Sequence, residues 1–247
     1  MKQLLVAAFL LLSSYQPHAK KMTLWLVGDS TMSIKETTAF PETGWGMPFV
    51  YFWDSTIAVD NRAKNGRSTK SFITEKRWDA VMEGMQPGDY VFVQFGHNDE
   101  VPTKATYTTE SEFRSNLTRY VTDTRSRKAI PVLLTPVARR KFDANGKVQG
   151  THDVYSAIVR QVATETKTVL IDLDARSQQL LQQWGEQPSA LLFNHLLPGE
   201  HPNYPDGKDD NTHFSELGAR MMAQLVLKAI REQLPELAQH IIAPAKK

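Results

Sequence analysis

The chain has 247 residues, of which 41% are hydrophobic and 23% charged, as is ordinary for one soluble globular domain. Lysine and arginine number 29 against 27 aspartate and glutamate residues, so the formal charge of +2 gives no global electrostatic basis for binding nucleic acid or an anionic membrane. The sequence has no cysteine, which excludes disulfides, a lipid-modified cysteine anchor, thiolate catalysis and thiolate metal sites.

The first 19 residues differ in character from the rest of the chain. Lys2 precedes an uninterrupted apolar run from Leu4 to Leu12, and a polar stretch follows as far as Ala19. This pattern predicts a secretory signal peptide over residues 1–19, because the apolar run is too short to span a bilayer. The mature chain is then one domain over residues 20–247, secreted or periplasmic, which we expect to be a monomer without membrane association.

Short apolar runs alternate with helix-like segments along the mature chain. Five runs are rich in strand-forming apolar residues, and most of them lack polar alternation, as strands covered on both faces do; they are Leu24 to Val27, Ile57 to Val59, Tyr90 to Phe95, Pro131 to Thr135 and Val169 to Leu173. Apolar residues recur at helical intervals in four segments, Ser71 to Met85, Glu110 to Arg127, Asp153 to Thr166 and Ser215 to Leu234. This alternation predicts an α/β fold, a three-layer α/β/α sandwich with a five-stranded parallel sheet.

Polar residues that follow the strands come first as candidates, because ligands of an open parallel sheet bind beyond the carboxyl ends of its strands. The first strand runs into "GDST", where Ser30 could also be an ordinary turn residue. As a nucleophile, a serine needs an imidazole base, and the imidazole needs a carboxylate that orients it. His213 and Asp210 in "DNTH" meet this need, and Ser215 can cap the helix that follows.

Acyl transfer also needs preorganised donors for the developing oxyanion. The backbone N–H groups of Ser30 and Gly66 and the side-chain amide of Asn98 suit this role. A glycine at position 66 permits close backbone approach. Structural roles are expected for three neighbouring polar residues, Asp29, His97 and Asp99.

The ordered blocks "GDST", "NGRS", "GHND" and "DNTH" resemble those of the SGNH or GDSL hydrolase superfamily, and "TGWG", "NRAKNGRSTKSF" and "VFVQFGHNDE" look like the rhamnogalacturonan acetylesterases of carbohydrate esterase family 12. The resemblance implies a flavodoxin-like fold, Ser30 as nucleophile, His213 as base and Asp210 as its orienter. It implies Ser30, Gly66 and Asn98 as the oxyanion hole. The implied activity is cofactor-independent removal of O-acetyl groups from galacturonate residues of rhamnogalacturonan, through an acyl-enzyme; acetylated xylan or a broad range of acetyl esters is the alternative.

Basic residues gather on two loops expected at the ligand-binding rim, although the whole chain is nearly neutral. They are Arg62, Lys64, Arg67 and Lys70 after the second strand, and Arg139, Arg140 and Lys141 after the fourth. An acidic polysaccharide would be attracted there, and arginine can pair with a uronate carboxylate through two hydrogen bonds. We predict substrate-binding roles for Arg67, Arg139 and Arg140, against the alternative of a solvated basic face.

Other kinds of function remain open at this stage. A metal loop could be built from His195, His201, Asp206, Asp209 and Asp210, but the run from Asp206 lacks the EF-hand pattern, and we expect no metal. A noncatalytic polysaccharide-binding protein could stack sugars on the five tryptophans, most of which lie in strand or helix patterns. A thioesterase or lipase on the same fold is disfavoured by the export signal and by the lack of a long apolar lid.

Overall fold

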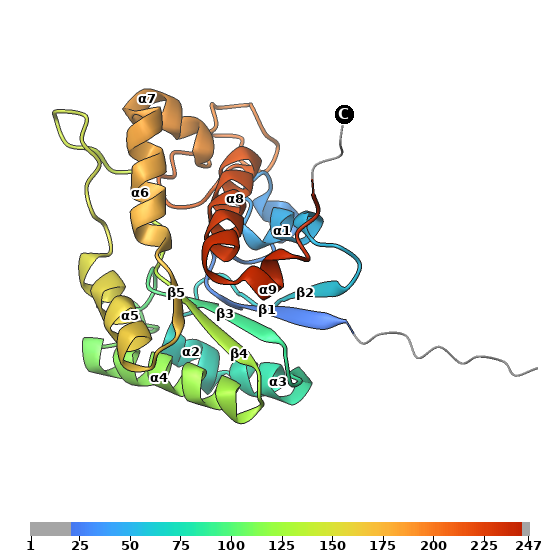
Figure 1. The fold of residues 1–247 in the computed structure, drawn as a ribbon. Helices are drawn as coiled ribbons and strands as arrows, with labels where there is room; N and C mark the ends of the chain where they lie inside the picture. The colour runs from blue at the N-terminus through green and yellow to red at the C-terminus, as the bar shows by residue number, and fades with distance from the viewer. Residues whose placement is uncertain (1–20, 244–247) are drawn as a thin grey trace, which may run out of the picture.

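The computed structural model describes residues 21–243, so the predicted signal peptide lies outside the described residues. Five strands form one all-parallel sheet in the order β2-β1-β3-β4-β5 (Figure 1). The strands are β1 (Met22–Gly28), β2 (Ile57–Asn61), β3 (Tyr90–Gln94), β4 (Ile130–Leu134) and β5 (Val169–Ile171). The predicted α/β fold with a five-stranded parallel sheet is confirmed, and the strand order is the flavodoxin-like one.

The central strand β1 explains why its sequence is apolar without interruption. Leu24 and Leu26 pack into the core on one face of the sheet, whereas Trp25 and Val27 pack into the core on the other. Successive side chains of a strand point to opposite faces, so both faces of β1 must be covered.

Helices form a layer on each face (Figure 1). One layer contains α1 (Gly46–Phe49), α6 (Leu173–Trp184), α8 (Glu216–Gln233) and α9 (Pro235–Ala238). The other contains α2 (Thr69–Thr74), α3 (Arg77–Gly84), α4 (Glu110–Ser126) and α5 (Asp153–Glu165). The remaining short helices are η1 (Thr37–Ala39), η2 (Val50–Phe52), α7 (Glu186–Ser189) and η3 (Ala190–Leu192). Within residues 21–243, every helix is too short or too polar to span a membrane.

Three predicted helices match α4, α5 and α8 to within one residue at each end. The prediction of one continuous helix from Ser71 to Met85 is wrong, because α2 ends at Thr74 and α3 begins at Arg77. Between them, Lys76 has a φ of +57°, a left-handed conformation that interrupts a helix. The apolar residues on both sides of the break still face the sheet, which is why their spacing looked continuous.

The end of the fifth strand also differs from the prediction. The strand β5 stops at Ile171, and Leu173 is the first residue of a helix, α6, that was not predicted. Asp172 caps this helix, since its side chain accepts a hydrogen bond from the backbone N–H of Ala175. Leu173 is fully buried, so its hydrophobicity alone does not distinguish a strand end from a helix start.

Candidate active site

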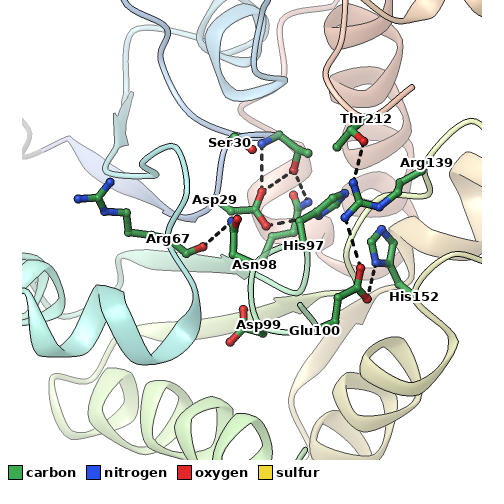
Figure 2. Close-up of polar contacts among 12 residues, drawn as sticks. Asp29, Ser30, Arg67, His97, Asn98, Asp99, Glu100, Arg139, His152 and Thr212 are labelled. Atoms are coloured by element: carbon green, nitrogen blue, oxygen red, sulfur yellow. Dashed lines mark hydrogen bonds and ion pairs between the residues drawn. The ribbon is translucent and has the colours of Figure 1, made fainter. Parts of the chain in front are cut away.

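The strand order changes direction between β1 and β3, which is where an open parallel sheet forms a ligand crevice at its carboxyl edge. Ser30 lies just beyond β1, and Asn98 lies just beyond β3. Because the two strands are parallel neighbours, both side chains emerge at this edge (Figure 2). The "GDST" and "GHND" segments therefore flank the crevice.

A serine, a histidine and an aspartate are lined up at this edge. Ser30 Oγ lies 2.9 Å from His213 Nε2, and His213 Nδ1 lies 2.8 Å from Asp210 Oδ2. The His213 side chain is 28% exposed, so solvent and substrate can reach it. The structure thus brings the three predicted residues together in the order that activation of a serine hydroxyl requires.

The loop before α8 holds the histidine and the aspartate in one short segment. Asp210 Oδ1 accepts hydrogen bonds from the backbone N–H groups of Thr212 (2.8 Å) and His213 (3.0 Å). Partial burial opposes ionisation, but the hydrogen bonds from His213 outweigh it and hold the pKa of Asp210 well below its ordinary value. Ser215 Oγ accepts from the N–H of Gly218, which confirms Ser215 as the N-cap of α8.

Two backbone donors at this edge have no acceptor among the described residues, namely the N–H groups of Ser30 and Gly66. Gly66 has a φ of +75°, a left-handed conformation that favours glycine. A Cβ at position 66 would meet no described atom within 4 Å. The glycine is therefore favoured for its backbone conformation, and close approach of its backbone to the oxyanion stays a prediction.

The Asn98 side chain has a fixed orientation. Its Nδ2 donates to the carbonyl oxygen of Arg67 at 3.0 Å (Figure 2), and its Oδ1 accepts from Lys104 Nζ at 2.9 Å. A primary amide has two N–H bonds, so one N–H of Asn98 remains available for an oxyanion.

Replacement of Asn98 by alanine is expected to lower kcat for acetate esters by roughly 10² to 10³-fold, the usual effect of losing one oxyanion donor. The measurement is steady-state hydrolysis of an aryl acetate, with folding checked by circular dichroism. Asn145→Ala, at an exposed loop tip, is the matched control and should keep the parent rate. Equal rates in the two folded variants would remove Asn98 from the oxyanion hole.

Buried polar residues beside the candidate nucleophile hold the backbone. Asp29 Oδ1 accepts from the N–H (3.0 Å) and the hydroxyl (2.8 Å) of Thr31. His97 Nδ1 lies 3.4 Å from Asp29 Oδ2, and burial lowers the pKa of His97 to about 4, which keeps its ring neutral at pH 7. Asp99 Oδ1 accepts from the N–H of Thr69, the first residue of α2, and burial raises the pKa of Asp99 to about 7. These contacts support the structural roles predicted for Asp29 and Asp99, whereas both ring nitrogens of His97 lack a hydrogen-bond partner among the described residues.

A polar network extends from the loop before α8, which carries Asp210 and His213 and is called the catalytic loop below, to the loop after β3 (Figure 2). Arg139 Nη1 donates to Thr212 Oγ1 at 2.7 Å, and Arg139 Nη2 lies 3.3 Å from Glu100 Oε1. The second oxygen of Glu100 lies 2.9 Å from His152 Nδ1. Arg139 also lines a groove of about 620 Å³ together with Lys141. Substrate binding by Arg139 stays a prediction. The structure also shows that Arg139 contacts the loop that carries His213.

The other two arginines with predicted substrate roles have partners within the protein. Arg67 Nε lies 3.0 Å from Glu75 Oε2. Arg140 donates to the carbonyl oxygen of Glu186 at 2.6 Å and to Asn211 Oδ1 at 2.9 Å, which joins two loops. Substrate contact by either arginine stays a prediction and would require these bonds to be shared or exchanged.

Two residues of the alternative metal loop, His195 and Asp209, pair with each other, whereas Asp210 pairs with His213. His195 Nδ1 lies 3.0 Å from Asp209 Oδ1, and His195 Nε2 lies 3.1 Å from Asn211 Oδ1. In the part of the chain that the structure describes, three potential ligand atoms come within 4.8 Å of one another at a different place, on Glu42, Asp210 and His213. This group is the Asp–His pair of the candidate triad with one more carboxylate.

The tryptophans do not form an exposed sugar-stacking surface. Four of them are buried, namely Trp25, Trp45, Trp53 and Trp78. Trp184 is partly buried against the core. The four buried tryptophans therefore cannot stack on sugars, and the alternative of polysaccharide binding through these four side chains is wrong.

Sequence reasoning missed a buried ion pair beside the candidate triad. Lys35 Nζ lies 2.7 Å from Glu42 Oε1, and the two side chains are 1% and 11% exposed. Both residues stand in a largely irregular segment after "GDST", where a charged side chain is usually solvated. No pattern in the sequence distinguishes this pair from surface charges.

A five-stranded parallel sheet with an aligned serine, histidine and aspartate beyond its strand ends defines an SGNH-type carboxylic ester hydrolase. The profile of the GDSL-like lipase/acylhydrolase family matches residues 26–221, and the chain belongs to this family.

Similar proteins match along most of the chain. Rhamnogalacturonan acetylesterase RhgT of Bacillus subtilis is 41% identical over 226 residues, which cover 91% of this chain and 96% of that protein. Probable rhamnogalacturonan acetylesterase YesY of the same organism is 34% identical, over 89% of this chain and 97% of that protein. The crystal structure of B. subtilis protein YxiM has a TM-score of 0.75 at 26% identity, over 87% of this chain and 57% of that longer one.

Proposed function

We propose that this protein is an acetylesterase that removes O-acetyl groups from a plant cell-wall polysaccharide, namely from galacturonate residues of rhamnogalacturonan. The observation that carries the proposal is the chain of contacts from Ser30 through His213 to Asp210, beside backbone donors that lack an acceptor within residues 21–243. The names of the similar acetylesterases support the acetyl group and the polymer. Export to the periplasm or the medium is part of the proposal and rests only on the sequence pattern of residues 1–19.

In the proposed reaction, Ser30 Oγ attacks the acetyl carbonyl carbon while His213 Nε2 accepts the hydroxyl proton, and Asp210 stabilises the resulting imidazolium. The N–H groups of Ser30, Gly66 and Asn98 donate to the oxyanion. His213 then gives its proton to the sugar oxygen, which leaves as a hydroxyl group, and the acetyl group stays on Ser30. A water molecule, deprotonated by His213, releases acetate and restores the serine.

The groove beside Arg139 supports an acidic polymer as substrate. Arg139 and Lys141 line it, and Arg139 reaches the catalytic loop through Thr212. The carboxylates of Glu100 and Asp153 also line the groove, and Glu100 contacts Arg139 and His152. A uronate carboxylate in the groove can pair with Lys141, or with Arg139 in exchange for its contact with Glu100.

Acetylated rhamnogalacturonan is expected to be the best of four substrates, the others being acetylated homogalacturonan, acetylated xylan and a neutral aryl acetate. Raising the ionic strength from about 0.02 M to about 0.5 M should lower kcat/KM on the two pectic polymers by roughly threefold to tenfold, because salt screens their attraction to the groove. The neutral ester should change little. The measurement is acetate release at both ionic strengths.

A charge variant localises the effect to the groove. Lys141→Gln should raise KM for acetylated rhamnogalacturonan by about threefold, since one attractive charge is lost. Lys228→Gln, which removes an exposed charge from the carboxyl-terminal half of α8, is the control and should leave KM unchanged. If xylan is the best polymer and salt affects all four substrates alike, the pectin assignment is wrong and the esterase mechanism is unaffected.

A further inference from the structure

We propose that the buried Lys35–Glu42 pair positions the candidate triad. In this proposal, Lys35 fixes Ser30 and the loop that carries Gly66, and Glu42 supplies a negative charge beside His213. This inference rests on the proposed function, because it concerns the same reaction at the same site.

Lys35 joins the two segments that form the oxyanion hole. Its Nζ donates to the carbonyl oxygen of Ser30 and to Asn65 Oδ1 at 3.0 Å, and it pairs with Glu42 Oε1 at 2.7 Å. An ammonium group has three N–H bonds, and these three oxygens use all of them. Asn65 directly precedes Gly66, so one side chain connects the nucleophile residue with the loop that carries the second backbone donor.

The contact with the Ser30 carbonyl matters because the same residue supplies both the attacking hydroxyl and an N–H donor. A shift of the Ser30 backbone would move both groups relative to the substrate carbonyl. Ser33 Oγ reinforces the link, since its one O–H donates to Asn65 Oδ1 while the oxygen lies 3.3 Å from the Ser30 carbonyl oxygen. Catalytic rates are sensitive to such displacements, and misplacement by about 1 Å can cost roughly 10²-fold.

Glu42 adds a second carboxylate near the histidine. One of its oxygens lies within 4.8 Å of ligand atoms of both Asp210 and His213, and Glu42 is only 9% exposed, so solvent screens it poorly. Its charge favours the imidazolium that forms when Ser30 loses its proton. Lys35 balances this charge in the resting enzyme.

Two cationic groups also lie near this loop, one of them beside Asp210 Oδ2, the oxygen that contacts His213. Lys208 Nζ is 3.9 Å from Asp210 Oδ2, and Arg139 contacts Thr212. Burial lowers the pKa of Lys35, while Glu42 opposes that shift, so the two buried ions depend on each other. Removing one member therefore leaves an uncompensated charge of predictable sign.

Three variants separate positioning from charge, with hydrolysis of a neutral aryl acetate followed over pH. Lys35→Met should lower kcat by roughly 10 to 10²-fold with KM within about twofold, because the Ser30 carbonyl and Asn65 lose the ammonium group that joins them. The acidic limb of its pH profile of kcat should move to higher pH, since the charge of Glu42 is no longer balanced and favours the imidazolium of His213. Glu42→Gln keeps an acceptor for Lys35 and should keep kcat within about threefold, while its acidic limb moves down by roughly 0.5 to 1 pH unit.

The double variant Lys35→Met/Glu42→Gln restores a neutral pair, so it should keep the low kcat while its acidic limb returns near the parent position. It also tests the positioning role if Lys35→Met alone does not fold, because it leaves no unpaired buried charge. The control is Glu165→Gln, which removes a glutamate from an exposed ion pair with Arg114 at 2.7 Å between α4 and α5 and should change neither kcat nor the limb.

The inference is wrong if a folded variant without Lys35 keeps the parent kcat, or if the limb of Glu42→Gln stays in place. Loss of activity that only parallels loss of thermal stability would also contradict it. The proposed function fails separately, if the parent enzyme hydrolyses no acetate ester.

Discussion

Ser30→Ala should lower kcat/KM for acetate esters by at least about 10⁴-fold, because the variant has no hydroxyl that could form the acyl-enzyme. The fold should persist, since among the described residues the Ser30 side chain makes one hydrogen bond, to His213, while the buried contacts nearby involve the backbone carbonyl of Ser30. Hydrolysis of an aryl acetate and thermal denaturation, measured on the same preparations, check both expectations.

The matched control for this variant is Ser111→Ala, at an exposed position in the first turn of α4. It should retain the parent kcat/KM. A folded Ser30→Ala protein with full activity would end the serine mechanism, whatever the polymer substrate proves to be.

Much of the site was predictable because its residues are placed by strand ends. Strands can be recognised from apolar runs, and parallel strands bring their carboxyl ends to one edge. Ser30 and Asn98 follow two such strands, so their proximity could be inferred without coordinates. His213 and Asp210 are only three residues apart, and a short loop can present both to the same point.

Contacts between irregular segments were not predictable in the same way. Lys35 and Glu42 meet because two parts of one loop fold back behind the site, and no periodic pattern encodes that path. The break between α2 and α3 depends on one left-handed residue, Lys76, whose side chain is typical of a helix. From the sequence, Arg140 is expected to be a free charge on the ligand-binding rim. The structure pairs it with the backbone carbonyl oxygen of Glu186, and a partner of this kind is not visible in a sequence.

Asp210→Asn is expected to lower kcat by about 10⁴-fold, the effect of giving a catalytic histidine the wrong tautomer. The backbone N–H groups of Thr212 and His213 both donate to Oδ1, so the variant should keep its amide oxygen there and turn its NH₂ group toward His213 Nδ1. Nδ1 would then accept a hydrogen bond, and the ring proton would sit on Nε2. A protonated Nε2 cannot take the proton of Ser30.

Asp209→Asn is the matched control, on the same loop and one residue away. Asp209 is exposed and pairs with His195, so its variant should keep kcat within about twofold. The hydrogen bonds from His213 hold the pKa of Asp210 low, so the parent carboxylate should stay ionised across the acidic limb of the pH profile of kcat. If both variants fold and lose activity equally, or if Asp210→Asn keeps the parent rate, Asp210 does not orient the base.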